Sequence, residues 1–314
     1  MTIKEFSRNF FIQELCPICI RKQSRNLSFS KSTLRKYRCT LKLVHQVFGQ
    51  DTIESLTTGE LENRLYEFHF ESGYSRSVIN TMIDALRHIY KEAQIEELVS
   101  WNPALKIQKL KTNPRPKTFM TKQELKDFFN PNIWDDKRFY TGFKIARYTG
   151  MRISEIRVLN SSDLFLKDDF YYILVQKTHN WIDGVKLPKS HNKRIVPLPY
   201  WLGKELNLQN KNRNFWFSDD LDDKPISTWR FHYQFVKKLE IIGISDEERK
   251  KRNLTVHSFR HRYISLLTGN VPYEQLCLIV GHKSQNTTKS YTHGMLNDFD
   301  SVLQHDFYRD PYDC

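Results

Sequence analysis

The chain has 314 residues, too many for one ordinary hydrophobic core, and this length predicts two compact domains. Hydrophobic residues make up 39% of the chain and charged residues 27%, which excludes a disordered protein. Lysine and arginine outnumber aspartate and glutamate by 49 to 36, and the net charge of +13 favours a polyanionic partner such as nucleic acid, although a basic surface without such a partner fits the charge equally well.

Residues 1–27 are interpreted as a short N-terminal segment. Their start is too charged and too short for a secretory signal, and the chain has no apolar run long enough to span a membrane, so neither export nor a membrane partner is expected. Five cysteines without framework spacing indicate reduced thiols in a cytoplasmic protein. Cys16 and Cys19 form one close pair, which fits either half of a zinc site or two ordinary thiols.

Three amphipathic helices are predicted within residues 28–105. Apolar residues recur every three or four positions over residues 31–49, and the remaining face is basic. Thr57 and Glu60 have the spacing of a capping box and start a second helix. Residues 75–97 form a third, which ends before a Trp-Asn-Pro sequence. The basic residues of the first helix are Lys31, Arg35, Lys36 and Lys42.

Residues 106–117 are interpreted as a linker between the two domains. Basic residues fill this stretch, and its two prolines favour a stiff, extended backbone. A second capping box, Thr121 with Glu124, then restarts helical structure. A second domain is therefore predicted over residues 118–294.

The second domain is predicted to be mainly helical with a small sheet. One helical pattern stops at Gly150, and others return near the end of the domain. Between them the apolar period changes, and three apolar runs separated by turn sequences predict a three-stranded antiparallel sheet. These runs lie at residues 171–175, 185–187 and 195–198. The expected fold class is mainly α with a small antiparallel β-sheet (α+β).

Two fragments of this domain carry residues suited to phosphate binding. Arg152 lies in Thr-Gly-Met-Arg-Ile-Ser-Glu, where a glycine ends one helix and the arginine opens the next, so its guanidinium and free backbone amides suit a phosphate. The alternative is a surface Arg152 paired with Glu155. His257 and Arg260 are three residues apart and would project from one helix face, a pattern that alone also fits a solvent-exposed basic helix end.

The third fragment begins where a helix breaks at Gly281. His282 follows at once, and Tyr291 comes nine residues later, after a stretch of small polar residues. Tyrosine is a weak nucleophile that needs help to lose its proton. Taken alone, such a tyrosine is more often a packing residue.

In this order, the fragments resemble the tyrosine recombinase, or phage integrase, family. The resemblance covers about residues 118–295 and rests on Thr-Gly-Met-Arg-x-x-Glu, His-x-x-Arg-His, and Gly-His with its later tyrosine. It implies a site-specific DNA recombinase with double-stranded DNA as its partner. It also implies that the second domain is an integrase-like catalytic domain and that residues 28–105 form a helical core-binding domain.

The resemblance implies a role for each motif residue. Arg152 and Arg260 hold the scissile phosphate, His257 and His282 assist around it, and Tyr291 attacks to form a 3′-phosphotyrosine and release a 5′-hydroxyl. Two guanidiniums suit the charge that develops on the phosphate oxygens, and histidines can move protons near neutral pH. The covalent link conserves the bond energy, so no cofactor, nucleotide or metal is expected. Glu155 is expected to orient its neighbours without a catalytic role.

The family also uses a lysine in a turn of the small sheet as the general acid. We choose Lys189, which precedes a Val-Pro-Leu strand end. Lys177 is the competitor, because compact family members place the lysine just after the first strand. The additional residues 179–187 favour Lys189. Either lysine could instead be only a phosphate contact.

Residues 295–314 carry apolar side chains every three or four positions, which predicts an amphipathic tail helix. This helix could pack on its own domain or, as is common in the family, dock on a neighbouring protomer. By the same resemblance we expect a homotetramer on DNA, possible accessory DNA-bending or directionality factors, and a cytoplasmic, nucleoid-associated location.

The longer hairpin resembles that of mobile-element or prophage integrases, so integration or excision is the expected task. Two other classes stay open at this point. One is a catalytically silent DNA-binding protein on the same fold. The other is a type IB topoisomerase-like enzyme, which shares the chemistry but relaxes DNA without sequence preference.

Overall fold

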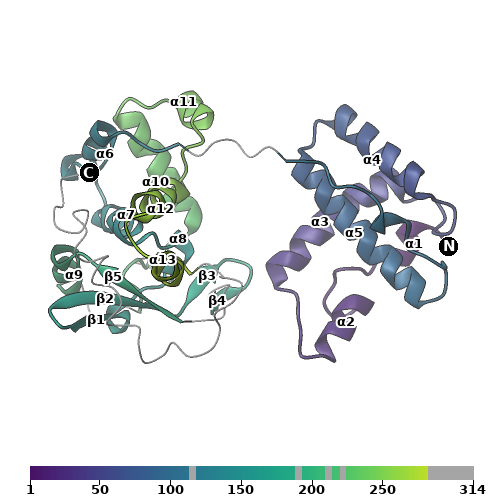
Figure 1. Cartoon of the computed structure of the whole chain (residues 1–314), viewed down its shortest axis with the longest axis horizontal. Coiled ribbons are helices and arrows are strands. Elements are labelled where there is room, and N and C mark those ends of the chain that lie inside the picture. The colour runs from purple at the N-terminus through teal and green to yellow at the C-terminus, as the bar shows by residue number, and fades with distance from the viewer. Residues whose placement is uncertain (113–117, 188–192, 209–213, 220–223, 282–314) are drawn as a thin grey trace. The chain divides into compact units, whose positions relative to one another are not determined.

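A computed structural model divides the chain into two units, Met1–Pro114 (unit 1) and Arg115–Cys314 (unit 2). Each unit buries its own hydrophobic core, and the helices and strands of both are labelled in Figure 1. Among the described helices, none combines the length and the apolar character needed to cross a membrane. The residues that the structure describes are 1–112, 118–187, 193–208, 214–219 and 224–281.

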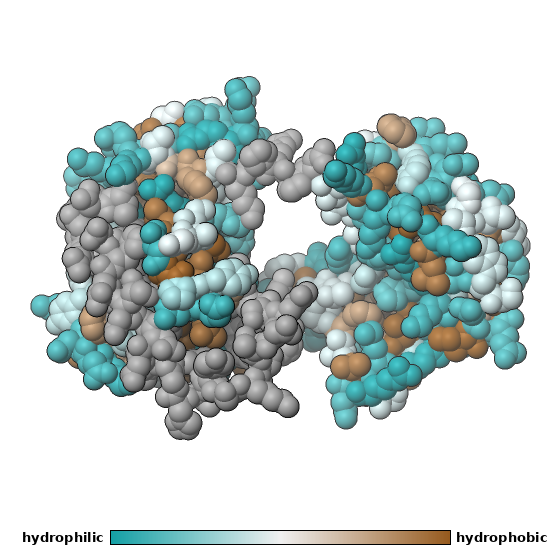
Figure 2. Space-filling view, in the orientation of Figure 1, coloured by the Kyte–Doolittle hydropathy of each residue, from teal (hydrophilic) through white to brown (hydrophobic). Residues whose placement is uncertain are grey.

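Unit 1 is a helical bundle in which α3 packs against α5 (Figure 1). The capping box predicted for α4 is present, because Thr57 N donates to Glu60 Oε2 at 2.8 Å while Glu60 N donates to Thr57 Oγ1 at 3.3 Å. The visible face of unit 1 is largely hydrophilic, with small hydrophobic patches (Figure 2). Its helices are α1 (Ile3–Ser7), α2 (Pro17–Gln23), α3 (Lys31–Phe48), α4 (Thr58–Ser72), α5 (Arg76–Ile95) and the 3-10 helix η1 (Pro103–Leu105).

Residues 1–27 are part of this bundle, so the expectation of a short segment outside the helical domain was wrong. Phe10 and Phe11 are buried in the same core as α3 and α5, as are Cys16 and Cys19. Periodicity could not detect this because α1 and α2 have only five and seven residues.

Cys16 and Cys19 are ordinary buried thiols in this core. Burial, with Cys16 beside it, raises the pKa of Cys19 to about 12, so this sulfur stays protonated at neutral pH. Within the described part of the chain, no third His, Cys, Asp or Glu completes a metal site with them. The half-zinc-site interpretation therefore finds no support there.

Unit 2 is mainly helical with two small antiparallel sheets, as the sequence predicts for the fold class. Its helices are α6 (Lys122–Phe128), η2 (Pro131–Ile133), α7 (Lys137–Thr149), α8 (Ile153–Ile156), η3 (Ser161–Asp163), α9 (Tyr200–Asn207), α10 (Thr228–Ile241), α11 (Asp246–Lys251), α12 (His257–Leu267) and α13 (Tyr273–Val280). Its strands are β1 (Leu164–Lys167), β2 (Phe170–Val175), β3 (Thr178–Asn180), β4 (Gly184–Lys186) and β5 (Arg194–Leu198).

The predicted three-stranded sheet has a different third strand. The sheet has the order β1-β2-β5, whereas β4, the middle strand of the prediction, pairs only with β3 in a separate hairpin. β1 was missed because its turn to β2 consists of Asp168 and Asp169. Both adopt a left-handed conformation, with φ of 49° and 63°, in a two-residue turn that glycine or asparagine more often marks.

The core of unit 2 is rich in aromatic rings. Phe128, Phe143, Phe235 and Phe259 lie within 5.5–6.1 Å of one another, measured between ring centroids, and connect α6, α7, α10 and α12. Tilted and edge-to-face pairs of this kind add to the stability gained from burial alone. They fix the ends of α7 and α12, from which the candidate site is built.

Candidate active site

The turn between α7 and α8 positions Arg152. α7 ends at Gly150, which adopts a left-handed φ of 60°, and a Cβ there would lie 2.5 Å from Cδ1 of Tyr263. Glycine is therefore required by both the backbone and the packing. Two residues later, Arg152 caps the start of α8 with its side chain 30% exposed.

Glu155 holds Arg152 in place. Its carboxylate accepts a hydrogen bond from the Arg152 backbone N–H at 2.9 Å and another from Arg152 Nη1 at 3.1 Å. The pairing that the sequence offered as an alternative is thus present, but it is not a surface pair, since the Glu155 side chain is only 2% exposed. A buried carboxylate of this kind orients the guanidinium that it contacts.

Arg194, which sequence reasoning missed, completes this cluster from β5. Its Nη1 and Nη2 donate to the two carboxylate oxygens of Glu155 at 3.0 and 2.7 Å, and its Nε donates to the carbonyl of Ile279 at 2.8 Å. Arg194 therefore connects the sheet, α8 and the end of α13. The available signal was an arginine that opens a strand ending in Val-Pro-Leu, because a buried arginine requires a carboxylate partner nearby.

Arg260 lies on α12, where its buried guanidinium joins the ends of two other helices. Its Nη1 donates to the carbonyl of Gly150 at 2.7 Å, and its Nη2 donates to the carbonyl of Val280 at 2.5 Å. A guanidinium has five N–H groups, and the described residues supply no acceptor for the other three. Arg260 thus combines a fixed position with spare donors.

The charges of this cluster do not balance. Burial, together with the positive charges of Arg152 and Arg194, lowers the pKa of Arg260 to about 10, whereas Glu155 opposes this shift. Arg260 therefore remains charged at neutral pH. Three guanidiniums share one carboxylate among the groups that act on Arg260, so the cluster carries an excess of positive charge suited to an anion.

Gly281 packs against this cluster at the end of α13. Its φ is 67°, and a Cβ there would come within 3.2 Å of Cδ and Nη1 of Arg194. The next residue in the sequence is His282. The Gly-His motif therefore begins beside the buried ion pair of Arg194 and Glu155.

The structure tests the arrangement of only some predicted catalytic residues. Arg152 and Arg260 belong to one cluster, and His257 opens α12 one turn before Arg260, on the exposed side of the helix. Lys177 follows β2 directly and is half-buried. The others lie outside the described residues, and these are Lys189, His282 and Tyr291.

A second buried arginine, also missed from the sequence, fixes the β3–β4 hairpin. Arg157 Nη1 donates to Thr228 Oγ1 at 2.6 Å, and Nη2 lies 3.1 Å from Nδ1 of His179 in β3. Burial lowers the pKa of Arg157 to about 10, and burial together with Arg157 lowers that of His179. The hairpin that follows Lys177 is thereby tied to α8 and α10.

Comparison with known proteins places this site in context. Residues 118–297, more than half of the chain, match the model of the phage integrase family. The chain is similar to the ICEBs1 integrase of Bacillus subtilis (strain 168), with 25% identity over 269 residues that cover 79% of this chain and 69% of that protein.

Two solved structures share the fold. The Tn1549 transposon integrase in complex with a circular intermediate DNA superposes with a TM-score of 0.71 at 21% identity, covering 90% of this chain and 92% of that one. A lambda integrase tetramer bound to a Holliday junction superposes with a TM-score of 0.66 at 16% identity, covering 92% of this chain and 80% of that one.

Proposed function

The chain belongs to the phage integrase family of tyrosine recombinases, which are DNA strand transferases, and on this premise we propose that it integrates and excises a mobile element or prophage. The similarity to the ICEBs1 and Tn1549 integrases supports this task over resolution of chromosome dimers. Its DNA substrate would place it at the nucleoid in the cytoplasm.

The arginine cluster is the observation that carries the proposal. Arg152 and Arg260 would bind the two non-bridging oxygens of one DNA phosphate, because Arg152 is partly exposed and Arg260 retains spare N–H donors. Glu155 and Arg194 act as positioning residues, since both are buried and contact the groups that hold Arg152 and α13. Guanidiniums fixed in this way need no reorganisation as charge develops on the phosphate.

The proposed reaction is a pair of transesterifications. The phenolate oxygen of Tyr291 attacks phosphorus, the bond from phosphorus to the 5′ oxygen breaks, and a 3′-phosphotyrosine forms. Lys189, with Lys177 as the competitor, donates the proton that makes the leaving oxygen a 5′-hydroxyl, and His257 and His282 assist at the phosphate. A 5′-hydroxyl of the partner strand then reverses these steps, releases Tyr291 and rejoins the DNA.

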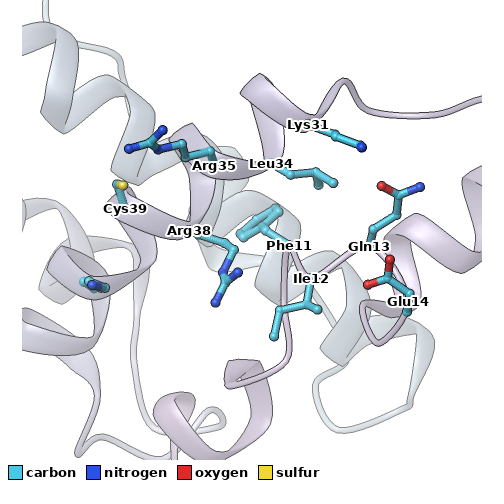
Figure 3. Close-up of a pocket in the computed structure, with 10 residues that line it drawn as sticks. Phe11, Ile12, Gln13, Glu14, Lys31, Leu34, Arg35, Arg38 and Cys39 are labelled. Carbon is cyan, nitrogen blue, oxygen red and sulfur yellow. The ribbon is translucent and has the colours of Figure 1, made fainter. Parts of the chain in front are cut away.

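Unit 1 would bind the DNA flanking the cleavage site through a basic face of α3. Lys31, Arg35, Arg38 and Lys42, here called the α3 stripe, follow at intervals of four, three and four residues and are all exposed. They border a groove of about 480 Å³, and Figure 3 shows three of them spread around Phe11. No acidic residue lies in α3, so the stripe suits a phosphate backbone.

We propose that four copies act together on two DNA sites. The tetramer of lambda integrase on a Holliday junction supports this assembly, as the fold is shared. Residues 295–314 would contribute contacts between copies, and accessory DNA-bending or directionality factors would set the direction of the reaction.

Trapping the covalent intermediate tests the proposal. The protein is incubated with a nicked duplex that carries the repeated sequence flanking its element, so that the cleaved strand diffuses away and the adduct accumulates. We expect an adduct with the wild type and with the control Tyr233→Phe, whose ring is exposed on α10, but none with Tyr291→Phe. An undiminished adduct in Tyr291→Phe would show that the nucleophile is wrong.

The same preparation distinguishes the other two classes. A catalytically silent DNA-binding protein would shift the duplex in a gel without forming any adduct. A topoisomerase-like enzyme would relax a supercoiled plasmid that lacks the repeated sequence, whereas we expect relaxation only of a plasmid that carries it.

A further inference from the structure

A cavity of unit 2, lined by residues outside the arginine cluster, lies between α6, α7 and α9. Its volume is about 400 Å³, and four aromatic rings line it, from Phe129, Tyr140, Tyr148 and Trp201. The Trp201 ring packs edge-on against Tyr148, with 5.1 Å between ring centroids. Walls of this kind suit a ligand that presents apolar or flat groups.

Arg147 brings an uncompensated positive charge to this cavity. Its side chain is 5% exposed, and its guanidinium lies 4.9 and 5.0 Å from the ring centroids of Phe129 and Tyr148. Its Nε has no hydrogen-bond partner, and no carboxylate of the described residues forms an ion pair with it. A buried guanidinium without an anion is costly, so the cavity is incomplete without an anionic ligand.

Lys144, one turn earlier on α7, is a contrasting cation. Its Nζ pairs with Glu205 of α9 and lies 4.5 Å from the ring centroid of Tyr140, so its charge is satisfied within the unit. The indole Nε1 of Trp201, like Nε of Arg147, is buried without an acceptor. Two N–H donors that line one cavity thus lack acceptors, and buried donors in native proteins nearly always have one.

We propose that this cavity binds the acidic, aromatic segment formed by residues 296–313 of this chain. The segment has five aspartates and one arginine, a net charge of −4 in a chain whose total is +13. An aspartate would supply the missing acceptor for Arg147, and a backbone carbonyl or a second carboxylate that for Trp201. The aromatic residues that would lie against the cavity wall are Phe299, Phe307, Tyr308 and Tyr312.

This assignment gives the contacts between copies a receiving surface. It rests on the proposed assembly only if the segment comes from a second copy, since the same segment could also bind to its own unit. The charge argument is the same in either case, because the cavity lacks an anion and residues 296–313 supply an excess of them.

Photocrosslinking in the full chain tests the proposal. The photoreactive amino acid p-benzoylphenylalanine replaces Phe307, and crosslinked peptides are identified by mass spectrometry after irradiation, with and without DNA. We expect crosslinks to peptides that contain α6, α7 or α9. Mixing isotopically heavy and light chains shows whether the segment binds its own copy or a second one, and both results support the cavity as the binding site.

Two variants give the test its specificity. Arg147→Gln removes the charge and Trp201→Phe removes the N–H but keeps a ring, and each should lower the crosslink yield about tenfold or more, because each leaves a buried group of the segment without its partner. The matched control is Arg230→Gln, which also removes a cation stacked on a ring, 5.7 Å from the Phe139 centroid, but outside the cavity. Circular dichroism checks that each variant is folded.

Crosslinks that map outside these three helices would overturn the assignment, as would unchanged yields in both cavity variants. The proposed function is tested separately by the adduct at Tyr291, which forms on a nicked duplex. An adduct without cavity crosslinks would refute the cavity alone, and cavity crosslinks without an adduct would refute the chemistry alone.

Discussion

Replacing Arg194 with methionine should destabilise unit 2 by about 3–5 kcal/mol, because the change leaves the Glu155 carboxylate buried without its two-point partner. The side chains of Arg194 and Glu155 are 5% and 2% exposed, and their paired atoms lie 2.7 and 3.0 Å apart. Solvent can replace little of the stabilisation that the pair provides. Urea unfolding followed by tryptophan fluorescence measures the effect, since five of the six tryptophans belong to unit 2.

Glu155→Gln provides the second arm of a double-mutant cycle. The double variant with Arg194→Met should be more stable than the sum of the single effects predicts, by about 1–3 kcal/mol, because it leaves no unpaired buried charge. The matched control is Lys250→Met, which breaks the exposed pair with Asp246 and should cost at most about 1 kcal/mol. Additive single effects would refute the buried pair as the cause.

The destabilisation should also depend on pH. Burial by itself raises the pKa of Glu155, but Arg194 and Arg152 outweigh it and hold that pKa below its usual value of 4.5. A carboxyl whose pKa is lower in the folded state stabilises the protein above its unfolded pKa, and this stabilisation is lost as the pH falls. In Arg194→Met burial would raise the pKa instead, so the stability gap between the wild type and this variant should narrow from neutral pH to pH values below 4.5. A constant gap would refute the reasoning.

Three further outcomes are expected. Gly150→Ala should cost about 1–2 kcal/mol for its left-handed backbone, with an added cost for the clash with Tyr263, and should reduce adduct formation; thermal unfolding and the nicked duplex measure both. A 5′-phosphorothiolate substrate, whose sulfur leaves without a proton, should restore cleavage to the variant that lacks the general acid, Lys189→Ala, but should not change a Lys177→Ala variant in which only phosphate binding is weakened. Neutralising the two arginines of the α3 stripe should lower the salt dependence of DNA binding by about 0.9 for each phosphate that the stripe then leaves unneutralised, and bound DNA should protect the exposed Cys39 from alkylation.

Elements whose signals are local could be predicted from the sequence. The capping boxes at Thr57 and Thr121 start α4 and α6 as expected, and the left-handed Gly150 ends α7. A cap and a helical period are properties of neighbouring residues, so they need no knowledge of the rest of the fold. The same holds for the spacing of His257 and Arg260, which lie one turn apart on α12.

Features that depend on distant partners could not be predicted in this way. β1 pairs with β2 through a turn without glycine, and α1 and α2 are too short to show a period. Arg194 and Glu155 are 39 residues apart, and Arg157 and Thr228 are 71 apart, so their pairing becomes visible only when the sheet and helices are assembled. A buried arginine inside an apolar sequence is the one signal that could have pointed to either pairing.

The way Arg260 is held explains why glycine precedes two of the site motifs. The Gly150 and Val280 carbonyls that it contacts lie at the C-terminal ends of α7 and α13, where helix dipoles favour a cation. A carboxylate partner would have neutralised the guanidinium, whereas carbonyls fix it and leave its charge available to a phosphate. Because both helices end at a left-handed glycine, the chain turns there, and the residues that follow Gly150 and Gly281 begin beside the same buried guanidinium.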